Sequence, residues 1–460
     1  MKAVIIGAGQ VGANLARYLS QAGKEVVVIE SDQAKCLELD DALDVVVIQG
    51  SGTSPTDLKG AGLDDADLLV AVTASDETNL MSVLLASDYL PATASKMARL
   101  RSREYLENEK LRNQFKVDVV VNPEVVLGEK ILRILAIPGA RDVVSFEDGK
   151  VYVVAFRAKE SWNIIGTSLK ELSRQFGHLK IMVGAILRGP VGDIGRRKVV
   201  IPDGATRIKP GDLVYFLMQK EHAGHLSEIG VSEGRPGRSI LIGGGGELSI
   251  QLADTLSQAG YGVRLLIGDP EVAVDASERL SKVIVLESSP ANLDMLTGLL
   301  EEGVDTYIGA CEDESVNVLT SVLAQKLGVD RTIVVSQDAA MMRLIKAVDI
   351  NIVLNPFDLA AAFVLRNIHQ VDVLDAKLLA GEDAEAIEFI PPDDASVIDK
   401  PLKDTHFPAG TLVAMIVRNG EIVIPRGHDR IQRGDRVIML CRRGSVPALE
   451  RMLCGGNRRR

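Results

Sequence analysis

A strand, a glycine-rich turn, a helix and a second strand follow one another within the first 32 residues. This order restricts the possible folds more than any other feature of the sequence. Ala3–Ile6 and Val26–Ile29 are apolar runs typical of strands, and the sequence Gly-Ala-Gly-Gln-Val-Gly at 7–12 leads into a helical pattern between them. A βαβ unit with glycines at this spacing predicts a doubly wound, Rossmann-like domain with a parallel sheet.

Each glycine of this turn has a separate role. Gly7 permits the tight turn, Gly9 lets the backbone approach a pyrophosphate, and Gly12 lets helix and strand pack closely. The helix that begins here directs its free N–H groups and the positive end of its dipole toward the phosphate. The residues that we expect to contact the phosphates are Gly7, Ala8, Gly9, Gln10, Val11 and Gly12.

The carboxyl ends of the predicted strands supply further candidates, because ligands of open α/β sheets bind outside these ends. Glu30 ends the second strand; its carboxylate would accept hydrogen bonds from ribose hydroxyls and repel a 2′-phosphate, which favours NAD over NADP. Ser51, Thr73, Ala74 and Arg99 follow or end later strands. Arg99 either pairs with a phosphate or forms an ion pair on the strand surface, and the sequence favours neither.

Composition limits the class of protein. The chain has 460 residues, too many for one core, and a net charge of −11, which argues against a nucleic-acid partner. No apolar run approaches the ~20 residues that span a bilayer, and the first strand begins too early for a signal peptide. The scattered cysteines predict reduced thiols of a cytosolic protein; they are Cys36, Cys311, Cys441 and Cys454.

The whole pattern occurs twice. Leu252–Gly260 repeats Leu15–Gly23, and Ile431–Val437 repeats Ile208–Val214 of a small, β-rich segment that ends in a helix predicted over His222–Ile229. The chain is therefore a tandem duplication of a two-domain unit. The four predicted domains are a first nucleotide-binding domain at 1–122, a small α+β domain at 139–230, a second nucleotide-type domain at 237–356 and a second small domain at 371–454.

The second copy lacks parts of the expected site. Ser249 replaces Gly12, and Ile267 replaces Glu30, although Asp269 could partly supply the lost carboxylate. Ala310-Cys311 aligns with Thr73-Ala74, and Arg99 falls on or near Val335. We expect this degenerate site to bind nucleotide weakly, differently or not at all, because an apolar side chain cannot hold a ribose hydroxyl.

Two helices predict an oligomer. The first begins at Pro123, and its apolar residues are expected to be exposed between domains; these are Val125, Val126, Ile131, Leu132 and Leu135. Its counterpart carries Leu359, Ala360, Phe363 and Val364. Either the helices pair between repeats or chains, which symmetry could close into a ring, or each covers only its own sheet.

The motifs together resemble the TrkA-type peripheral subunit of bacterial potassium uptake systems, whose domains are called RCK. The resemblance covers nearly the whole chain and rests on residues 7–12, 71–79, 98–99, 146–151 and 385–389. It implies a non-enzymatic cytosolic regulator that binds NAD, NADH, ATP or ADP through Gly7–Val11, Glu30, Thr73, Ala74 and Arg99. It also implies a tetrameric ring at the inner face of the cell membrane, beneath a potassium-translocating subunit of the TrkH/TrkG type.

The main alternative is an NAD-dependent oxidoreductase. Hydride transfer needs a placed acid or base, and His178, His222 and His225 show no catalytic pattern. The small domains are also small for a substrate domain. A ligand-sensing transcription regulator is disfavoured, because neither a helix-turn-helix nor basic charge is evident.

Overall fold

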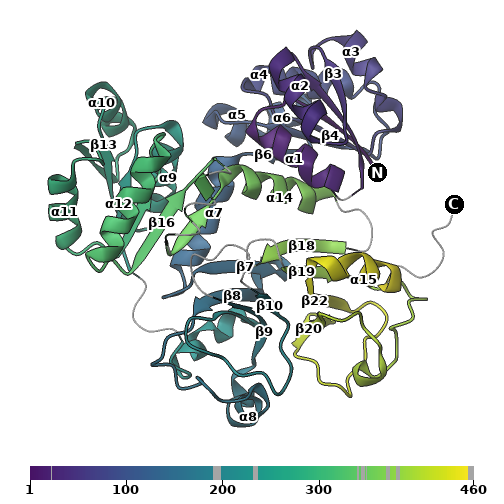
Figure 1. Ribbon diagram of the computed structural model, residues 1–460. Coiled ribbons are helices and arrows are strands. Elements are labelled where there is room, and N and C mark those ends of the chain that lie inside the picture. Colours follow the sequence, from purple (N-terminus) through teal and green to yellow (C-terminus); the bar gives the residue numbers. More distant parts are fainter. Residues whose placement is uncertain are drawn as a thin grey trace. The chain divides into compact units, whose positions relative to one another are not determined.

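The computed structural model describes residues 1–460 except 22, 190–197, 232–236, 339–340, 343–344, 346–347, 349, 369–372, 380–383 and 454–460. The chain forms two compact units. The first unit comprises Met1–Leu127 and Asn355–Ile368, and the second comprises Gly128–Leu354 and His369–Arg460. The boundary falls inside the helix that begins at Pro123 (Figure 1).

A parallel six-stranded sheet forms the centre of the first unit, with the order β3-β2-β1-β4-β5-β6. Its strands are β1 (Lys2–Ile6), β2 (Glu25–Glu30), β3 (Val46–Gln49), β4 (Leu68–Ala71), β5 (Ser95–Arg99) and β6 (Val119–Val121). The helices are α1 (Gln10–Gln21), α2 (Gln33–Ala42), α3 (Pro55–Gly60), α4 (Asp76–Ala86), α5 (Arg103–Glu107) and α6 (Glu109–Gln114). Apolar cores lie on both faces of the sheet, as the near-continuous apolar strands require. The doubly wound prediction is confirmed.

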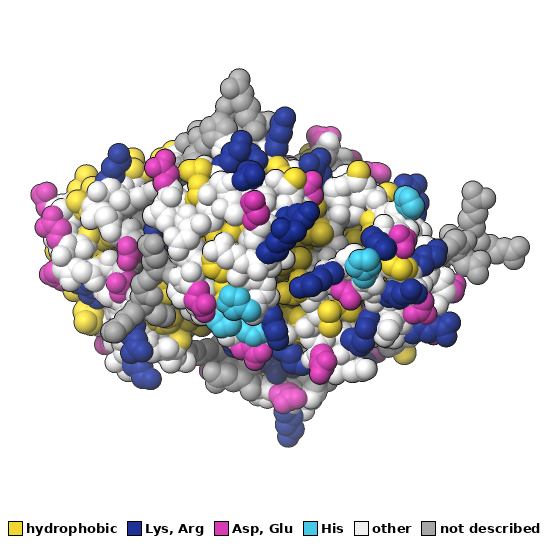
Figure 2. Space-filling view, turned by 90° about the horizontal axis from the view of Figure 1, so that it is seen from below, with side chains coloured by type: hydrophobic (Ala, Val, Ile, Leu, Met, Phe, Trp, Pro, Cys, Tyr) yellow, Lys and Arg dark blue, Asp and Glu magenta, His cyan; other side chains and the backbone are white. Residues whose placement is uncertain are grey.

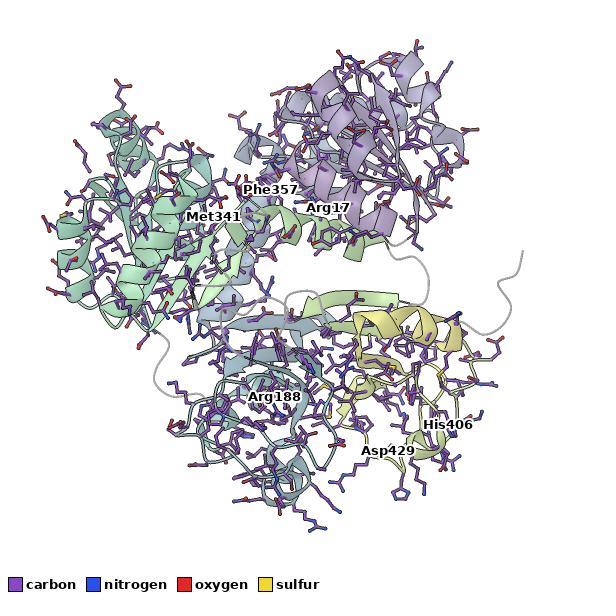
Figure 3. The ribbon with its side chains drawn as sticks, viewed as in Figure 1. Arg17, Arg188, Met341, Phe357, His406 and Asp429 are labelled. Atoms are coloured by element: carbon purple, nitrogen blue, oxygen red, sulfur yellow. The ribbon has the colours of Figure 1, made fainter. Side chains whose placement is uncertain are left out.

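A helix from the far end of the chain completes one of these cores. Helix α14 (Pro356–Ile368) packs along α1, and its residues Ala360, Ala361 and Val364 are fully buried with Leu15 and other residues of α1 (Figure 1). Phe357, labelled in Figure 3, packs against the same core. The apolar stripe of α14 therefore covers the first nucleotide fold, although α14 follows the second in sequence.

Helix α7 (Pro123–Leu135) follows the first nucleotide fold as α14 follows the second. The prediction that its apolar residues are exposed is wrong for most of them. Of its expected exposed residues only Val125, at 42%, is exposed, whereas Ile131 and Leu135 are fully buried. A side-chain carbon on Gly128 would lie 3.0 Å from Thr255 of α9, the helix that corresponds to α1 in the second fold. The apolar face is therefore used inside the chain, because close helix packing excludes solvent from it.

The second unit contains a second parallel sheet, with the order β14-β13-β12-β15-β16-β17. Its strands are β12 (Ser239–Gly243), β13 (Gly262–Ile267), β14 (Val283–Glu287), β15 (Thr306–Gly309), β16 (Arg331–Val335) and β17 (Ile352–Leu354). The helices are α9 (Glu247–Gln258), α10 (Pro270–Arg279), α11 (Leu293–Glu301) and α12 (Glu314–Lys326). Strand order and direction match the first sheet, so the duplication extends to the topology.

Two antiparallel five-stranded sheets form the small domains of the same unit. The first contains β7 (Asp142–Phe146), β8 (Val151–Arg157), β9 (Ile181–Arg188), β10 (Lys198–Val200) and β11 (Leu213–Gln219), with helix α8 (Leu169–Gln175). The second contains β18 (Val373–Leu379), β19 (Ala384–Phe389), β20 (Thr411–Arg418), β21 (Glu421–Val423) and β22 (Arg436–Arg442), with helix α15 (Val446–Leu453). The predicted helix over His222–Ile229 is instead a 3₁₀ helix over Lys220–Ser227.

The two small domains share one apolar core, in which Leu217 and Leu440 are fully buried. Arg436 of the second domain donates to the buried Glu147 of the first over 2.7 Å. Figure 2 shows the face seen from below, where basic side chains gather near the centre with acidic ones around them. Within the first small domain, Arg188, labelled in Figure 3, forms an ion pair of 2.7 Å with Asp212.

Candidate functional site

The glycine turn between β1 and α1 has the geometry that its sequence predicts. Gly7 adopts a φ of +100°, which glycine tolerates and other residues rarely do. A side-chain carbon on Gly12 would lie 1.9 Å from the carbonyl oxygen of Gly7, so only glycine fits there. On Gly9 the same carbon would meet no atom within 4 Å. The turn is therefore closely packed at Gly7 and Gly12 and open at Gly9, where a ligand could approach the backbone.

Glu30 fixes this turn to the end of β2. Its carboxylate accepts hydrogen bonds from the Ala8 N–H at 2.6 Å, the Asp32 N–H at 2.9 Å and the Ser31 hydroxyl at 3.1 Å. Burial opposes ionisation, but these hydrogen bonds outweigh it, and the pKa of Glu30 lies below its ordinary value. A carboxylate that is ionised at neutral pH therefore lies beside the glycine turn.

The loop after β3 places Ser51 at the same edge of the sheet. The Ser51 N–H donates to Asp57 over 2.8 Å, and its exposed hydroxyl lies 2.9 Å from that of Thr53. A side-chain carbon on Gly52 would lie 2.1 Å from Ile6 of β1, so this loop lies against the end of the central strand. The hydroxyl of Ser51 is therefore exposed at this edge and can contact a ligand that binds there.

Asn79 organises the ends of β4 and β5, a role that the sequence analysis did not assign. Its side-chain oxygen accepts hydrogen bonds from the N–H and the hydroxyl of Thr73 at 2.8 and 2.7 Å. Its amide group donates to the carbonyl oxygens of Thr73 at 3.3 Å and Arg99 at 2.9 Å. The sequence offers only a weak signal for this role, an amide side chain next to the apolar Leu80 in the predicted helix. The structure shows that Asn79 is fully buried and bonded.

Asp76, one turn earlier in α4, holds the segment after β5. Its carboxylate accepts hydrogen bonds from the N–H groups of Arg101 at 2.9 Å and Ser102 at 2.8 Å. The guanidinium of Arg101 donates to the carbonyl oxygen of Ala74. Thr73 and Ala74 are therefore held in place from both sides by hydrogen bonds from α4 and the chain after β5.

Arg99 forms an ion pair, one of its two predicted alternatives. A guanidinium nitrogen lies 3.3 Å from a carboxylate oxygen of Glu124 in α7, and the two side chains are 14% and 12% exposed. Burial lowers the pKa of Arg99, against the attraction of Glu124. Phosphate binding by Arg99 stays a prediction.

The second copy of the site differs in geometry as well as sequence. Ser249 fits at the position of Gly12 because the turn changes: its hydroxyl donates to the Gly246 carbonyl over 2.7 Å, and Gly244 lacks the positive φ of Gly7. Glu247, at the start of α9, is bound by Arg279 at 2.8 Å. A carboxylate at the helix N-terminus competes with a phosphate for the same positive end of the dipole.

Hydrogen bonds correct two details of the alignment between copies. Asn317 repeats Asn79, but it binds the N–H and carbonyl of Cys311 at 2.6 and 2.8 Å, so Cys311 and not Ala310 corresponds to Thr73. One extra residue between β12 and β15 causes this shift. Asp269 caps α10 as Asp32 caps α2, so it does not replace the carboxylate of Glu30.

In the part of the chain that the structure describes, no group of three or more His, Cys, Asp and Glu side chains could hold a metal ion. None of the helices described combines the length and apolar character needed to cross a membrane.

The geometry defines a class of protein with two nucleotide-type folds in tandem, one with a glycine turn open at Gly9 and one with an altered turn. The sequence matches the TrkA-N domain over residues 3–123 and 240–356, and the TrkA-C domain over residues 153–229 and 386–453. The chain belongs to the TrkA family.

Known proteins are similar to this chain in sequence and in fold over nearly its whole length. The Trk system potassium uptake protein TrkA of Halomonas elongata is 31% identical over 445 residues, which is 95% of each chain. The fold is similar to the GsuK RCK domain, with a TM-score of 0.61, 15% identity and coverage of 98% and 94% of the two chains. It is also similar to the GsuK channel bound to NAD, with a TM-score of 0.62, 15% identity and coverage of 98% and 78%.

Proposed function

We propose that the chain is a regulatory subunit of a potassium uptake system that binds NAD(H) or an adenine nucleotide in its first domain. The open side of Gly9, beside an ionised Glu30 and the first turn of α1, carries this proposal. The nucleotide contacts are Gly7–Gly12, Glu30, Ser51, Thr73, Ala74 and Arg99. Membership of the TrkA family supports potassium uptake as the process.

The partner is a membrane-embedded potassium-translocating subunit of the TrkH/TrkG type, and the chain lies in the cytoplasm at the inner face of the membrane. Copies of the chain assemble into a ring, most simply a tetramer. A bound nucleotide shifts an equilibrium between ring shapes by its different affinity for each, and the attached subunit responds. The family assignment and the tandem folds support this arrangement.

The function is regulatory and not catalytic. All six histidines lie outside Met1–Leu127 and Asn355–Ile368, so the unit with the glycine turn has no histidine for proton transfer. We expect purified protein to consume no NADH in the presence of keto acids or aldehydes. Steady oxidation that Gly9→Val abolishes would instead support the oxidoreductase.

Isothermal titration with NAD, NADH, ATP and ADP tests the site. Gly9→Val should abolish binding, because its side chain fills the open space over the turn. Gly246→Val, at the corresponding position of the second copy, is the matched control and should leave the affinity unchanged. Equal loss in both variants would contradict the assignment to the first domain. Light scattering tests assembly, since a mass near the 49.4 kDa of one chain would exclude the ring.

A further inference from the structure

The pair of Arg99 and Glu124 is incompletely bonded. Only one contact, at 3.3 Å, joins two groups that can form two parallel hydrogen bonds. Within the described part of the chain, neither Nε of Arg99 nor Oε2 of Glu124 has a hydrogen-bond partner, although both atoms are buried. A buried donor and a buried acceptor thus remain available on the two sides of the same ion pair.

Each partner belongs to a different functional element. Arg99 ends β5, and Asn79 ties its carbonyl to Thr73 in the candidate site. Glu124 lies in the first turn of α7, which Asn122 begins by accepting a hydrogen bond from the Val125 N–H at 2.9 Å. Helix α7 carries the chain from the first compact unit into the second. The ion pair therefore connects the nucleotide site to the start of the connecting helix.

The second copy forms the same local structure without a charged pair at these two positions. Asn355 caps α14 through the N–H groups of Phe357 and Asp358, just as Asn122 caps α7. Asn317 binds the carbonyl of Val335, just as Asn79 binds that of Arg99. The same local structure therefore forms with Val335 and Phe357 at the two positions. The charged pair is present only in the copy that keeps the glycine turn and Glu30.

We infer that Glu124 is a positioning residue that holds Arg99 in the nucleotide-free chain, and that a phosphate of the bound nucleotide takes Arg99 from it. Nucleotide binding then frees the first turn of α7. The vacant Nε of Arg99 gives the phosphate a donor, and Glu124 competes with the phosphate as the alternative anion. This inference rests on the proposed function, since it requires a nucleotide in the first domain.

The test compares Glu124→Gln with Glu129→Gln, a control on the same helix whose side chain is 57% exposed and paired with Arg133. Titration with NAD, NADH, ATP and ADP should show Glu124→Gln binding the preferred nucleotide about threefold to tenfold more tightly than wild type. Glu129→Gln should match wild type. Arg99→Gln should weaken binding, and adding Glu124→Gln to it should change nothing further, because the competition is already gone.

Hydrogen exchange gives a second readout that needs no variant. The Asn122 cap forms without the ion pair, so the pair can only add to the protection of this turn. Nucleotide should therefore speed exchange of the Val125 and Val126 amides in wild type to the rate that folded Glu124→Gln shows without nucleotide. A Glu124→Gln protein that melts normally but binds no tighter, or an α7 that exchanges equally with and without nucleotide, would overturn the inference alone. Wild-type protein that binds none of the four nucleotides would overturn the proposed function and the inference together.

Discussion

Gly12→Ala tests the close contact on which the glycine turn depends. The new carbon would lie 1.9 Å from the Gly7 carbonyl oxygen, roughly 1.5 Å closer than ordinary contact. Because the obstructing atom belongs to the backbone, it cannot turn away as a side chain could. Overpacking of this kind costs about 3 kcal/mol or more, whereas alanine regains at most about 1 kcal/mol of helix propensity. The clash therefore outweighs the propensity gain.

We expect a net loss of about 2 kcal/mol, which lowers the melting temperature of the first unit by roughly 5–10 °C. Differential scanning calorimetry of the full chain measures it. Two controls use the same replacement residue. Gly9→Ala should melt as wild type, because nothing lies within 4 Å of the new carbon. Ser249→Ala, at the matching position of the second copy, should lose only about 1 kcal/mol with its hydrogen bond to Gly246.

An unchanged melting temperature for Gly12→Ala would refute the reasoning, since the Gly7 carbonyl would then be free to move. The same result would remove the structural reason for glycine at this position. A large destabilisation by Gly9→Ala would also contradict it, because it would show that the open side of the turn is filled in solution.

Three further predictions concern single side chains. The lowered pKa of Glu30 stabilises the fold above its ordinary value of 4.5, and this stability disappears as pH falls through the lower folded value; acid denaturation of Glu30→Gln should therefore lack that part of the pH dependence. Asn79→Leu should cost about 2–4 kcal/mol in urea unfolding, because it leaves the half-buried N–H of Thr73 and the carbonyl of Arg99 without their partner, whereas the exposed Asn113→Leu should cost little. Partial burial raises the pKa of Cys311 from 9.0 to about 11, so iodoacetamide at pH 8 should alkylate it about a hundredfold more slowly in native than in guanidinium-unfolded protein, and equal rates would contradict the raised pKa.

Most of the fold could be predicted from local signals in the sequence. The alternation of apolar runs, glycines and helical patterns was sufficient for both parallel sheets, because strand and helix periods are set by neighbouring residues. The helix predicted to begin at Pro123 does begin there, and its predicted counterpart is α14, which begins at Pro356. The Lys220–Ser227 segment was less clear, since a short stretch with Gly224 at its centre fits a 3₁₀ helix as well as an α-helix.

By itself, the sequence determined the duplication, the order of elements and the three glycines of the turn, because each is written in adjacent residues. Only the tertiary structure decided which segments meet. It placed α14 on α1, paired Arg99 with Glu124, and made Asn79 the link between Thr73 and Arg99. Such contacts join residues up to several hundred positions apart, and packing against the whole fold selects them among many partners of equal local chemistry.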